Sequence, residues 1–578
     1  MEKIEKQFFN LDEIVVEKNR ICDGPTTGRW SVVPYKNKLG EGKLLFAEKD
    51  SHPESLTLTL GLSGWHRIFI AMVPFIHAEP QTCIYLRLSG DFCNTGVKSS
   101  PRTPRTWAPK EYIEEVYWKS ADLTGQSLII SHPSDAWAPS SSSLVWIRCV
   151  PMSEEEITAH LAGAQDNTKC VHAHIDEDAA YNDILLEEDY LMKLEQMKDT
   201  DIEVLSFETS GYYDTVPAQD GAVFGGKEYE VIYNRCLGYL RKRSEIYKKT
   251  VDNAHAYNIK ILAALRVSLN APGNRDAFLF RIRFPEEHPE YFCKNRDGSV
   301  LKSLSYAYPE VQDFMIGWFA DVLQYGFDGI SLILTRGPLF GFEQPVAERF
   351  SKRYPNIAME RLPMADPRLH GIWCDIMTDF IHRLRMELKT TEGKRIWINT
   401  ITDFGLDTSK NSGFDVERWA REGLIDSACQ GDIEVYENLD GCMSDAEPGL
   451  IDMEKYNAVI GDRPVIQRTY SSMKKVYQYI PQYLELGEKY GIDTYHNLPW
   501  MGSVSPEEFA ETGEKLREAG ARKFFWYNTN HAGWDLPEFY TCALLGRGLP
   551  EGVQLRTFTR TLSIDGLDIS HFNPEWRG

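Results

Sequence analysis

The stretch YPEVQDFMIGWFADVLQYGFDGISLILTRGPLFGFE, residues 308–343, combines the patterns from which the fold can be predicted. Residues 311–323 repeat apolar side chains at helical spacing, and Gly326 stands where a helix C-cap is expected. The apolar run 330–334 is typical of a strand buried on both faces of a parallel sheet. Polar residues then resume at Thr335, Arg336 and Glu343. A helix that leads into a buried strand with a polar carboxyl end is the unit of a (β/α)₈ barrel.

Similar helix and strand patterns recur through the chain, and together they predict a TIM (β/α)8 barrel over residues 168–578, including a C-terminal extension. A doubly wound open sheet is the competing architecture. The segment 433–470 is ambiguous because PVIQRTY within it resembles a further strand, so the count could differ by one. The eight expected strands are 170–176, 202–208, 259–267, 330–334, 395–401, 425–432, 491–499 and 521–530.

Residues 1–152 have a different character, with short alternating apolar runs separated by Gly, Pro and Ser clusters. This pattern predicts an antiparallel β-sandwich domain ahead of the barrel. Six of the fourteen tryptophans lie in its first 150 residues, so it could be a carbohydrate-binding or accessory domain, or its tryptophans could be core. Residues 153–167 are expected to hold a linker helix with Ser153 as its N-cap.

The charge, hydropathy and cysteine content of the chain limit the binding partners and the cellular compartment that we expect. A formal net charge of −22 without a basic run argues against nucleic acid. The N-terminus lacks the apolar core of a signal peptide, and nowhere do 18 apolar residues run together, so we expect no membrane partner and a cytoplasmic location. The eleven cysteines are scattered without CxxC spacing, which favours a reducing compartment. The composition is compatible with self-association into a homo-oligomer.

Polar side chains at the carboxyl ends of the expected strands should converge on one mouth of the barrel. They mix carboxylates, amides, imidazoles, arginines and an aromatic ring, which suits a neutral polyhydroxyl ligand whose ring packs on an aromatic face. No phosphate-binding glycine motif is present. The residues predicted to bind substrate are His172, His174, Asp176, Arg266, Arg336, Asn399, Gln430, His496, Trp526 and Asn528.

Glycoside hydrolysis usually needs two carboxyl groups across the scissile bond. We predict Glu208 and Glu343 as the acid/base pair with Asp403 in reserve, and Asp432 is a further available acid. Each has a structural alternative. Glu208 could pair with Arg266, Glu343 could lie in the first turn of the next helix, and Asp403 could form an Asx-turn.

The phrases YPEVQDFMIGWFADVLQYGFDGISL, TRGPLF, GFDVERWAREGLIDS and SPEEFAETGEKLREAGARKFFWYNTN resemble the glycoside-hydrolase-like barrels grouped as glycosyl-hydrolase-like family 10. The resemblance covers residues 168–535 and implies a TIM barrel that acts on carbohydrate. Relatives in that group commonly carry an acid in the fourth strand where this chain has Ile333. The seventh strand, in TYHNLPW, also lacks the glutamate of retaining barrels. A loop acid could substitute, the chemistry could differ, or the barrel could bind carbohydrate without cleaving it.

A metal-dependent hydrolase is the remaining alternative. His172 and His174 are two residues apart in a strand, so both imidazoles should face the barrel interior. Metal-dependent amidohydrolase barrels resemble this first strand, but they need further histidines on later strands, which the fifth and sixth expected strands lack. We therefore expect neither a metal nor a cofactor, and a carbohydrate substrate as the partner.

Overall fold

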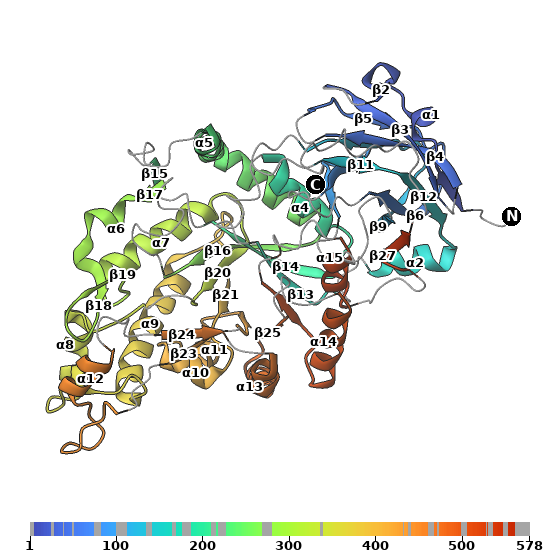
Figure 1. Ribbon diagram of the computed structural model, residues 1–578. Helices are drawn as coiled ribbons and strands as arrows, with labels where there is room; N and C mark the ends of the chain where they lie inside the picture. Colours follow the sequence, from blue (N-terminus) through green and yellow to red (C-terminus); the bar gives the residue numbers. More distant parts are fainter. Residues whose placement is uncertain are drawn as a thin grey trace.

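Eight parallel strands pair in a ring in the computed structural model of the chain (Figure 1). Each strand hydrogen-bonds to the next, and β26 pairs with β13 to close the ring. The predicted TIM barrel is confirmed, and the open sheet is wrong. The strands are β13 (Val171–Ile175), β14 (Ile202–Glu208), β16 (Lys260–Arg266), β20 (Gly329–Ile333), β21 (Trp397–Ile401), β22 (Ser427–Cys429), β25 (Asp493–Asn497) and β26 (Phe524–Trp526).

The structure describes most of the chain, and every statement below refers to these residues. They are 5–24, 28–37, 40–48, 51–73, 82–99, 112–133, 141–163, 169–175, 187–209, 215–217, 227–268, 280–335, 339–431, 433–436, 441–460, 467–470, 473–498, 506–527, 529, 536–546 and 553–560.

Alternate residues of each barrel strand face opposite ways, and this alternation separates two cores. One set fills the barrel interior with side chains such as Val204, Leu262 and Phe525. The other set, including Leu205 and Ala263, joins a continuous core with the surrounding helices. A residue's phase within its strand therefore decides whether it can reach the barrel mouth.

The helices lie around the ring (Figure 1). The helix predicted from residues 311–323 is α7 (Pro309–Leu323), and its C-cap is Gln324 rather than the predicted Gly326. Gly326 instead takes φ +100° in the turn that follows, before β20. The helices between and after the barrel strands are α4 (Glu187–Met197), α5 (Lys227–Ala256), α6 (Arg283–Glu287), α7 (Pro309–Leu323), α8 (Gln344–Arg353), α9 (Pro367–Glu387), α10 (Leu406–Asn411), α11 (Val416–Arg421), α12 (Met453–Ile460), α13 (Met473–Tyr490), α14 (Pro506–Glu518) and α15 (Leu536–Ala543).

Three small hairpins lie outside the ring. β23 (Ile433–Tyr436) and β24 (Gln467–Tyr470) pair only with each other, so the ambiguous PVIQRTY segment adds no barrel strand. The long segment after β16 contains short elements of its own, as functional or structured long loops do. The other two hairpins are β15 (Thr215–Pro217) with β17 (Phe280–Ile282), and β18 (Phe292–Lys294) with β19 (Val300–Leu304).

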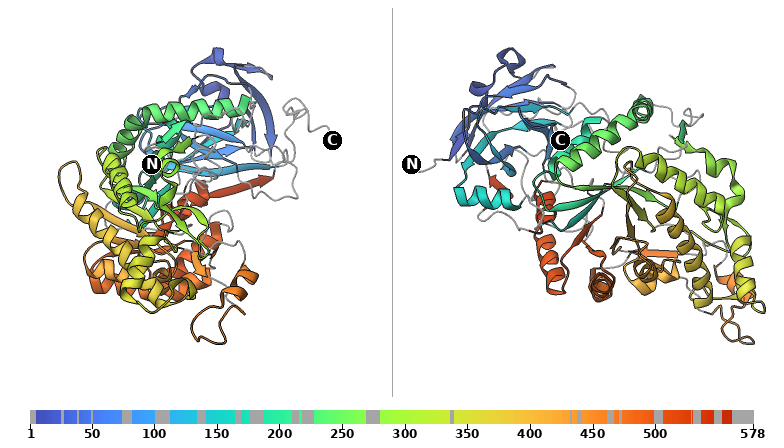
Figure 2. Two further views of the ribbon diagram at one scale, coloured as in Figure 1. Left: turned by 90° about the vertical axis from the view of Figure 1, so that its left-hand side faces the viewer. Right: turned by 180° about the vertical axis from the view of Figure 1, so that it is seen from behind.

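The N-terminal part forms largely antiparallel sheets beside the barrel, which the view from behind in Figure 2 also shows. Their buried side chains include Trp30, Trp118 and Trp146, so these tryptophans are core residues. One five-stranded sheet has the order β1-β12-β6-β9-β27, and two four-stranded sheets have the orders β5-β10-β7-β8 and β11-β4-β3-β2. The strands are β1 (Lys6–Phe8), β2 (Ile21–Asp23), β3 (Trp30–Asn37), β4 (Gly40–Ala47), β5 (Leu56–Leu58), β6 (Trp65–Met72), β7 (Cys83–Leu88), β8 (Thr95–Lys98), β9 (Tyr112–Asp122), β10 (Leu128–Ser131), β11 (Ser142–Leu144), β12 (Trp146–Pro151) and β27 (Arg556–Arg560).

The chain returns to these N-terminal sheets after the barrel. β27 pairs antiparallel with β9, although more than 400 residues separate them in sequence (Figure 1). Part of the predicted C-terminal extension of the barrel therefore belongs structurally to the N-terminal sheets. The exact domain limits at 152 and 168 stay a prediction.

The predicted linker helix is α2 (Glu154–Gly163). Ser153 Oγ accepts a hydrogen bond from the Glu156 backbone at 3.2 Å, and Glu156 Oε2 accepts one from the Ser153 backbone at 2.6 Å. This reciprocal pair is a capping box, so the prediction of Ser153 as N-cap is confirmed.

Within the described part of the chain, no helix is long and apolar enough to cross a membrane. Eight of the ten cysteines described there are buried.

Close packing of β20 against β21 depends on Gly329. A Cβ built there would lie 1.9 Å from the Trp397 carbonyl oxygen, a backbone atom that cannot move without disturbing the ring. We expect Gly329→Ala to lower the free energy of unfolding by about 3 kcal/mol, measured by urea denaturation. Gly371→Ala, inside α9, is the control. A Cβ there meets nothing closer than 4.0 Å, so this variant should gain about 0.5–1 kcal/mol. Equal losses in both variants would contradict the role of Gly329.

Candidate functional site

Four side chains meet inside the barrel at the carboxyl ends of β13, β14, β16 and β26. Arg266 Nε donates to Glu208 Oε1 at 2.8 Å, and His174 Nε2 lies 3.8 Å from Glu208 Oε2. The Tyr527 ring stacks on the His174 ring, with centroids 4.5 Å apart and planes 1° from parallel. We call His174, Glu208, Arg266 and Tyr527 the mouth cluster.

Strand phase brings this cluster together. His174 and Glu208 each lie two residues beyond another interior side chain, His172 and Ser206. Arg266 is on the neighbouring strand β16, which pairs with β14. Its planar guanidinium group can therefore donate to the Glu208 carboxylate on the adjacent strand. The Glu208 side chain is fully buried, whereas that of Arg266 is 14% exposed. Arg266 therefore lies between the carboxylate and the solvent, at the boundary that a ligand would meet.

A polar layer lies one step deeper in the barrel. His172 Nε2 is 2.7 Å from Ser206 Oγ, and its Nδ1 is 3.3 Å from Cys429 Sγ. Burial lowers the pKa of His172 well below its ordinary value and raises the pKa of Cys429 well above its own, so this pair is neutral. Asn399 donates to Ser331 Oγ at 2.8 Å and accepts from Ser427 Oγ at 2.7 Å.

These contacts correct two of the predicted substrate contacts. His172 and Asn399 do face the barrel interior, but both are fully buried and hydrogen-bonded within the layer. The expectation that both imidazoles of the first strand enter the interior is confirmed. Only His174 belongs to the mouth cluster. His172 and Asn399 instead support the cluster from below.

The donor set does not favour the metal-dependent alternative. Both ring nitrogens of His172 already have neighbours within the layer. Among the residues described, no three or more His, Cys, Asp or Glu side chains gather as a metal site would require. The side chains around His174 are a carboxylate already paired with arginine and an aromatic ring.

Glu343, predicted as half of the acid/base pair, has a structural role. It is the N-cap residue of α8 and is completely buried. Its carboxylate accepts hydrogen bonds from the backbone of Gly341 at 2.9 Å and of Lys294 at 3.0 Å, and from the Ser305 hydroxyl. Burial raises the pKa of Glu343, and these hydrogen bonds oppose the rise. The carboxylate thus links the β18–β19 hairpin to the start of α8. This N-cap position is one residue before the helix, next to the first helical turn that the sequence offered as the structural alternative.

Asp403 is also buried and engaged. Its Oδ2 accepts from Ser412 Oγ at 2.8 Å, and its backbone oxygen accepts from the Tyr483 hydroxyl at 3.0 Å. Ser412 is the C-cap of α10, so Asp403 fixes the turn at the end of that helix. Neither Glu343 nor Asp403 belongs to the mouth cluster.

Three further predicted residues lie on the outer side of the barrel wall, which corrects their placement. The Gln430 amide donates to the carbonyls of Phe404 and Val476 at 2.9 and 3.0 Å. His496 packs edge-on against Tyr483 of α13, and Trp526 packs against Phe539 of α15. In each case the neighbouring strand residue, Cys429, Tyr495 or Phe525, faces inward instead. The physical cause is a phase error of one residue, which reverses the face of a strand side chain.

Sequence analysis missed Tyr527, the aromatic ring of the mouth cluster. Its signal was the alternation Phe525–Tyr527, which puts both rings on one face of the eighth strand. Ile333 is fully buried in the interior core, so an apolar side chain occupies the fourth-strand position at which the predicted resemblance implied an acid. Asp176, Arg336 and Asn528 lie outside the described residues.

No protein-family model matches the chain, and no curated protein matches it. The solved structures that it resembles include an α-galactosidase from Thermus thermophilus, at 11% identity over 88% of this chain and 94% of that one, with a TM-score of 0.33. A maltogenic α-amylase from Thermotoga neapolitana matches at 14% identity over 68% and 71%, with a TM-score of 0.32.

The glycoside hydrolase domain of PelA from Pseudomonas aeruginosa matches at 12% identity over 48% of this chain and 83% of that one, with a TM-score of 0.27. These solved structures are all glycoside hydrolases by their descriptions. Similarity at this level carries no argument about activity, and the barrel is established by its own strand pairing. The resemblance to glycosyl-hydrolase-like family 10 in particular stays a prediction.

The burial of His496 on the outer side of the barrel wall makes the free energy of unfolding depend on pH. Burial lowers the pKa of His496 to about 4, and its Nε2 has no hydrogen-bond partner in the described structure. An unfolded histidine titrates near pH 6.5, so the unfolded chain binds more protons between these values. The stability contributed by neutral His496 is therefore complete above about pH 6.5 and is lost as the pH falls toward 4, by up to about 3 kcal/mol.

We expect His496→Gln to reduce the loss of stability on acidification. The measurement is the free energy of unfolding in urea at pH 8 and at pH 5 for both proteins, and the pH 8 values remove any effect of the substitution on packing. An equal decrease in both proteins would show that His496 is not buried in its neutral form.

Proposed function

We propose that this chain is a glycoside hydrolase whose barrel mouth binds carbohydrate around Glu208. One observation carries the proposal: a buried carboxylate at a strand's carboxyl end that accepts a hydrogen bond from Arg266 and lies beside His174 and its stacked tyrosine. Ligand-facing groups of closed (β/α)₈ barrels lie at this end of the strands. Carboxylate, guanidinium, imidazole and phenol together supply both donors and acceptors for sugar hydroxyls.

The surroundings of Glu208 favour one of the two carboxylate roles. Arg266 donates directly to Oε1, and an adjacent positive charge stabilises the ionised carboxylate. An ionised carboxylate serves as nucleophile or as general base, whereas the acid must hold a proton. We therefore assign Glu208 to the nucleophile or base position. His174, with its ring orientation fixed by Tyr527, would position the Oε2 side of the carboxylate.

A hydrolase of this kind needs a second carboxyl group as the acid. We do not assign the acid to Glu343 or Asp403, because their carboxylates are buried and hydrogen-bonded to neighbouring segments. The sequence offers Asp176 after β13 and Asp432 after β22 for this role. Both follow strands whose carboxyl ends open at the same mouth.

A carbohydrate-binding barrel without hydrolytic activity is the second candidate. The observation that favours it is Ile333, whose apolar side chain lies in the interior where a catalytic acid is common in the resembling group. The two candidates differ in turnover. A binding barrel would show ligand-dependent thermal shifts with oligosaccharides, and no release of reducing ends.

The central test is Glu208→Gln, which keeps the shape of the side chain and removes its charge. On whichever member of an aryl-glycoside and oligosaccharide panel the parent protein hydrolyses, we expect kcat/KM to fall at least about 100-fold. The readout is released phenol or reducing ends. Unchanged hydrolysis would remove Glu208 from the mechanism.

Glu343→Gln is the matched variant, with the same chemical change at a carboxylate that we assign to structure. It replaces an oxygen that accepts from backbone N–H groups by an NH₂ group, so we expect the free energy of unfolding to fall by about 1–3 kcal/mol. Turnover per folded molecule should stay within a few-fold of the parent. Loss of turnover in a fully folded Glu343→Gln protein would return Glu343 to the catalytic pair.

A further inference from the structure

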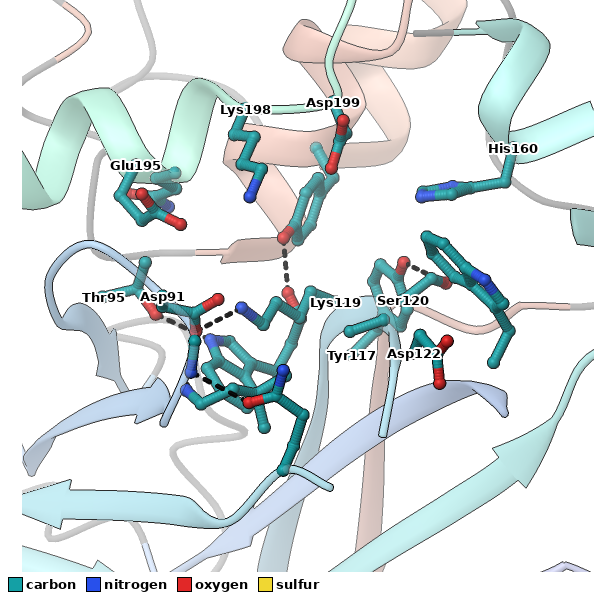
Figure 3. Close-up of a pocket in the computed structure, with 18 of the residues that line it drawn as sticks. Asp91, Thr95, Tyr117, Lys119, Ser120, Asp122, His160, Glu195, Lys198 and Asp199 are labelled. Carbon is teal, nitrogen blue, oxygen red and sulfur yellow. Dashed lines mark hydrogen bonds and ion pairs between the residues drawn. The ribbon is translucent and has the colours of Figure 1, made fainter. Parts of the chain in front are cut away.

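A cavity lies between the N-terminal sheets and the outside of the barrel (Figure 3). Its volume is about 270 Å³. Strand β9 supplies its floor, α2 and α4 supply two walls, and Tyr540 of α15 closes it together with Leu544, which directly follows that helix. The mouth cluster contributes no residue to this cavity, so it is a separate site in space.

One polar atom of a residue that lines the cavity lacks a hydrogen-bond partner in the described structure. Gln196 on α4 is 94% buried and lines the cavity. Its Nε2 donates no hydrogen bond to any residue that the structure describes. A buried amide without a partner costs about 1–3 kcal/mol, and natural structures usually satisfy such groups with a ligand or with water. Gln196 therefore indicates that the cavity accepts a molecule that offers a hydrogen-bond acceptor.

The charged groups of the cavity already have partners within the protein. Asp91 pairs with Lys119 at 2.5 Å, and Glu195 accepts from the Tyr257 hydroxyl. Asp122 accepts from Thr124 at 2.6 and 2.9 Å. Because these carboxylates are engaged, the cavity offers no concentrated charge for a cation, and their excess over the two lysines disfavours an anion. A neutral ligand fits this balance.

An aromatic wall and hydroxyl groups complete the lining. The partly exposed Trp65 lies beside His160, with ring centroids 5.4 Å apart. The hydroxyls of Tyr117 and Ser120, which also line the cavity, are 2.9 Å apart and can exchange hydrogen bonds with a ligand. Lys198 and Asp199 stand at the exposed rim. An aromatic face with amide and hydroxyl groups matches the two sides of a sugar ring.

We propose that this cavity binds a single neutral sugar ring of the pyranose class, as a binding site distinct from the barrel mouth. The volume is slightly below the range of typical small-molecule pockets, which suits one ring and excludes a longer chain lying within it. The ligand contacts both β9 and α4, so its binding would hold the N-terminal sheets against the barrel.

The experiment is saturation-transfer NMR and isothermal titration of the full chain with four free monosaccharides: glucose, galactose, mannose and N-acetylglucosamine. We expect at least one to bind, with a dissociation constant in the millimolar range. Gln196→Leu, which keeps the size of the side chain, should weaken that binding about tenfold. Because Gln196 Nε2 makes no hydrogen bond in the described structure, this variant should fold with a thermal stability equal to or above that of the parent in the absence of sugar. Trp65→Ala, at the partly exposed wall, should also weaken binding.

Glu208→Gln separates the two sites. Its monosaccharide affinity at the cavity should equal that of the parent protein, even though hydrolysis is lost. The proposal is overturned if none of the four sugars binds. It is equally overturned if Gln196→Leu and Trp65→Ala both bind like the parent while Glu208→Gln does not, because the sugar would then occupy the barrel mouth.

Discussion

Closure of the eight-stranded ring is the constraint on which the rest of this structure depends. Pairing of β26 with β13 leaves no free edge, and it assigns every strand residue to the interior or to the helix-facing side. The interior is narrow and packed, so polar side chains can stay there only with hydrogen-bond partners. The layer around His172 and Asn399 meets that condition, and the mouth cluster stands directly on it.

The buried carboxylates Glu343 and Glu208 differ in the groups that donate hydrogen bonds to them, and this difference separates a structural role from the proposed functional one. Glu343 accepts from backbone N–H groups of two separate segments, an arrangement that fixes the chain path. Glu208 instead faces two side chains, Arg266 and His174, at the open end of the ring. Burial alone does not identify a catalytic acid. We base our proposal for Glu208 on its side-chain donor Arg266, which is 14% exposed, whereas two of the donors to Glu343 are backbone N–H groups.

The N-terminal sheets are integrated with the barrel through both ends of the chain. β27 returns from beyond the barrel to pair with β9, and Tyr540 of α15 donates its hydroxyl to the Trp118 carbonyl in that same sheet. The cavity around Gln196 is lined on one side by the N-terminal sheets and on the other by α4 and Tyr540. The sheets therefore act as more than an appended module, because they share one cavity with the outside of the barrel.

The sequence by itself determined the barrel, the order of its eight strands, the capping box at Ser153 and the inward pair His172 and His174. These follow from local periodicity and from capping chemistry, which neighbouring residues fix. Tertiary structure decided the phase of the short strands β22, β25 and β26, and so the outward faces of Gln430, His496 and Trp526. It also decided the structural role of Glu343 and the joining of β27 to β9. Three- to five-residue strands carry too few alternations to set their own phase, and partners distant in sequence leave no local pattern, so only closure of the ring and long-range pairing could fix them.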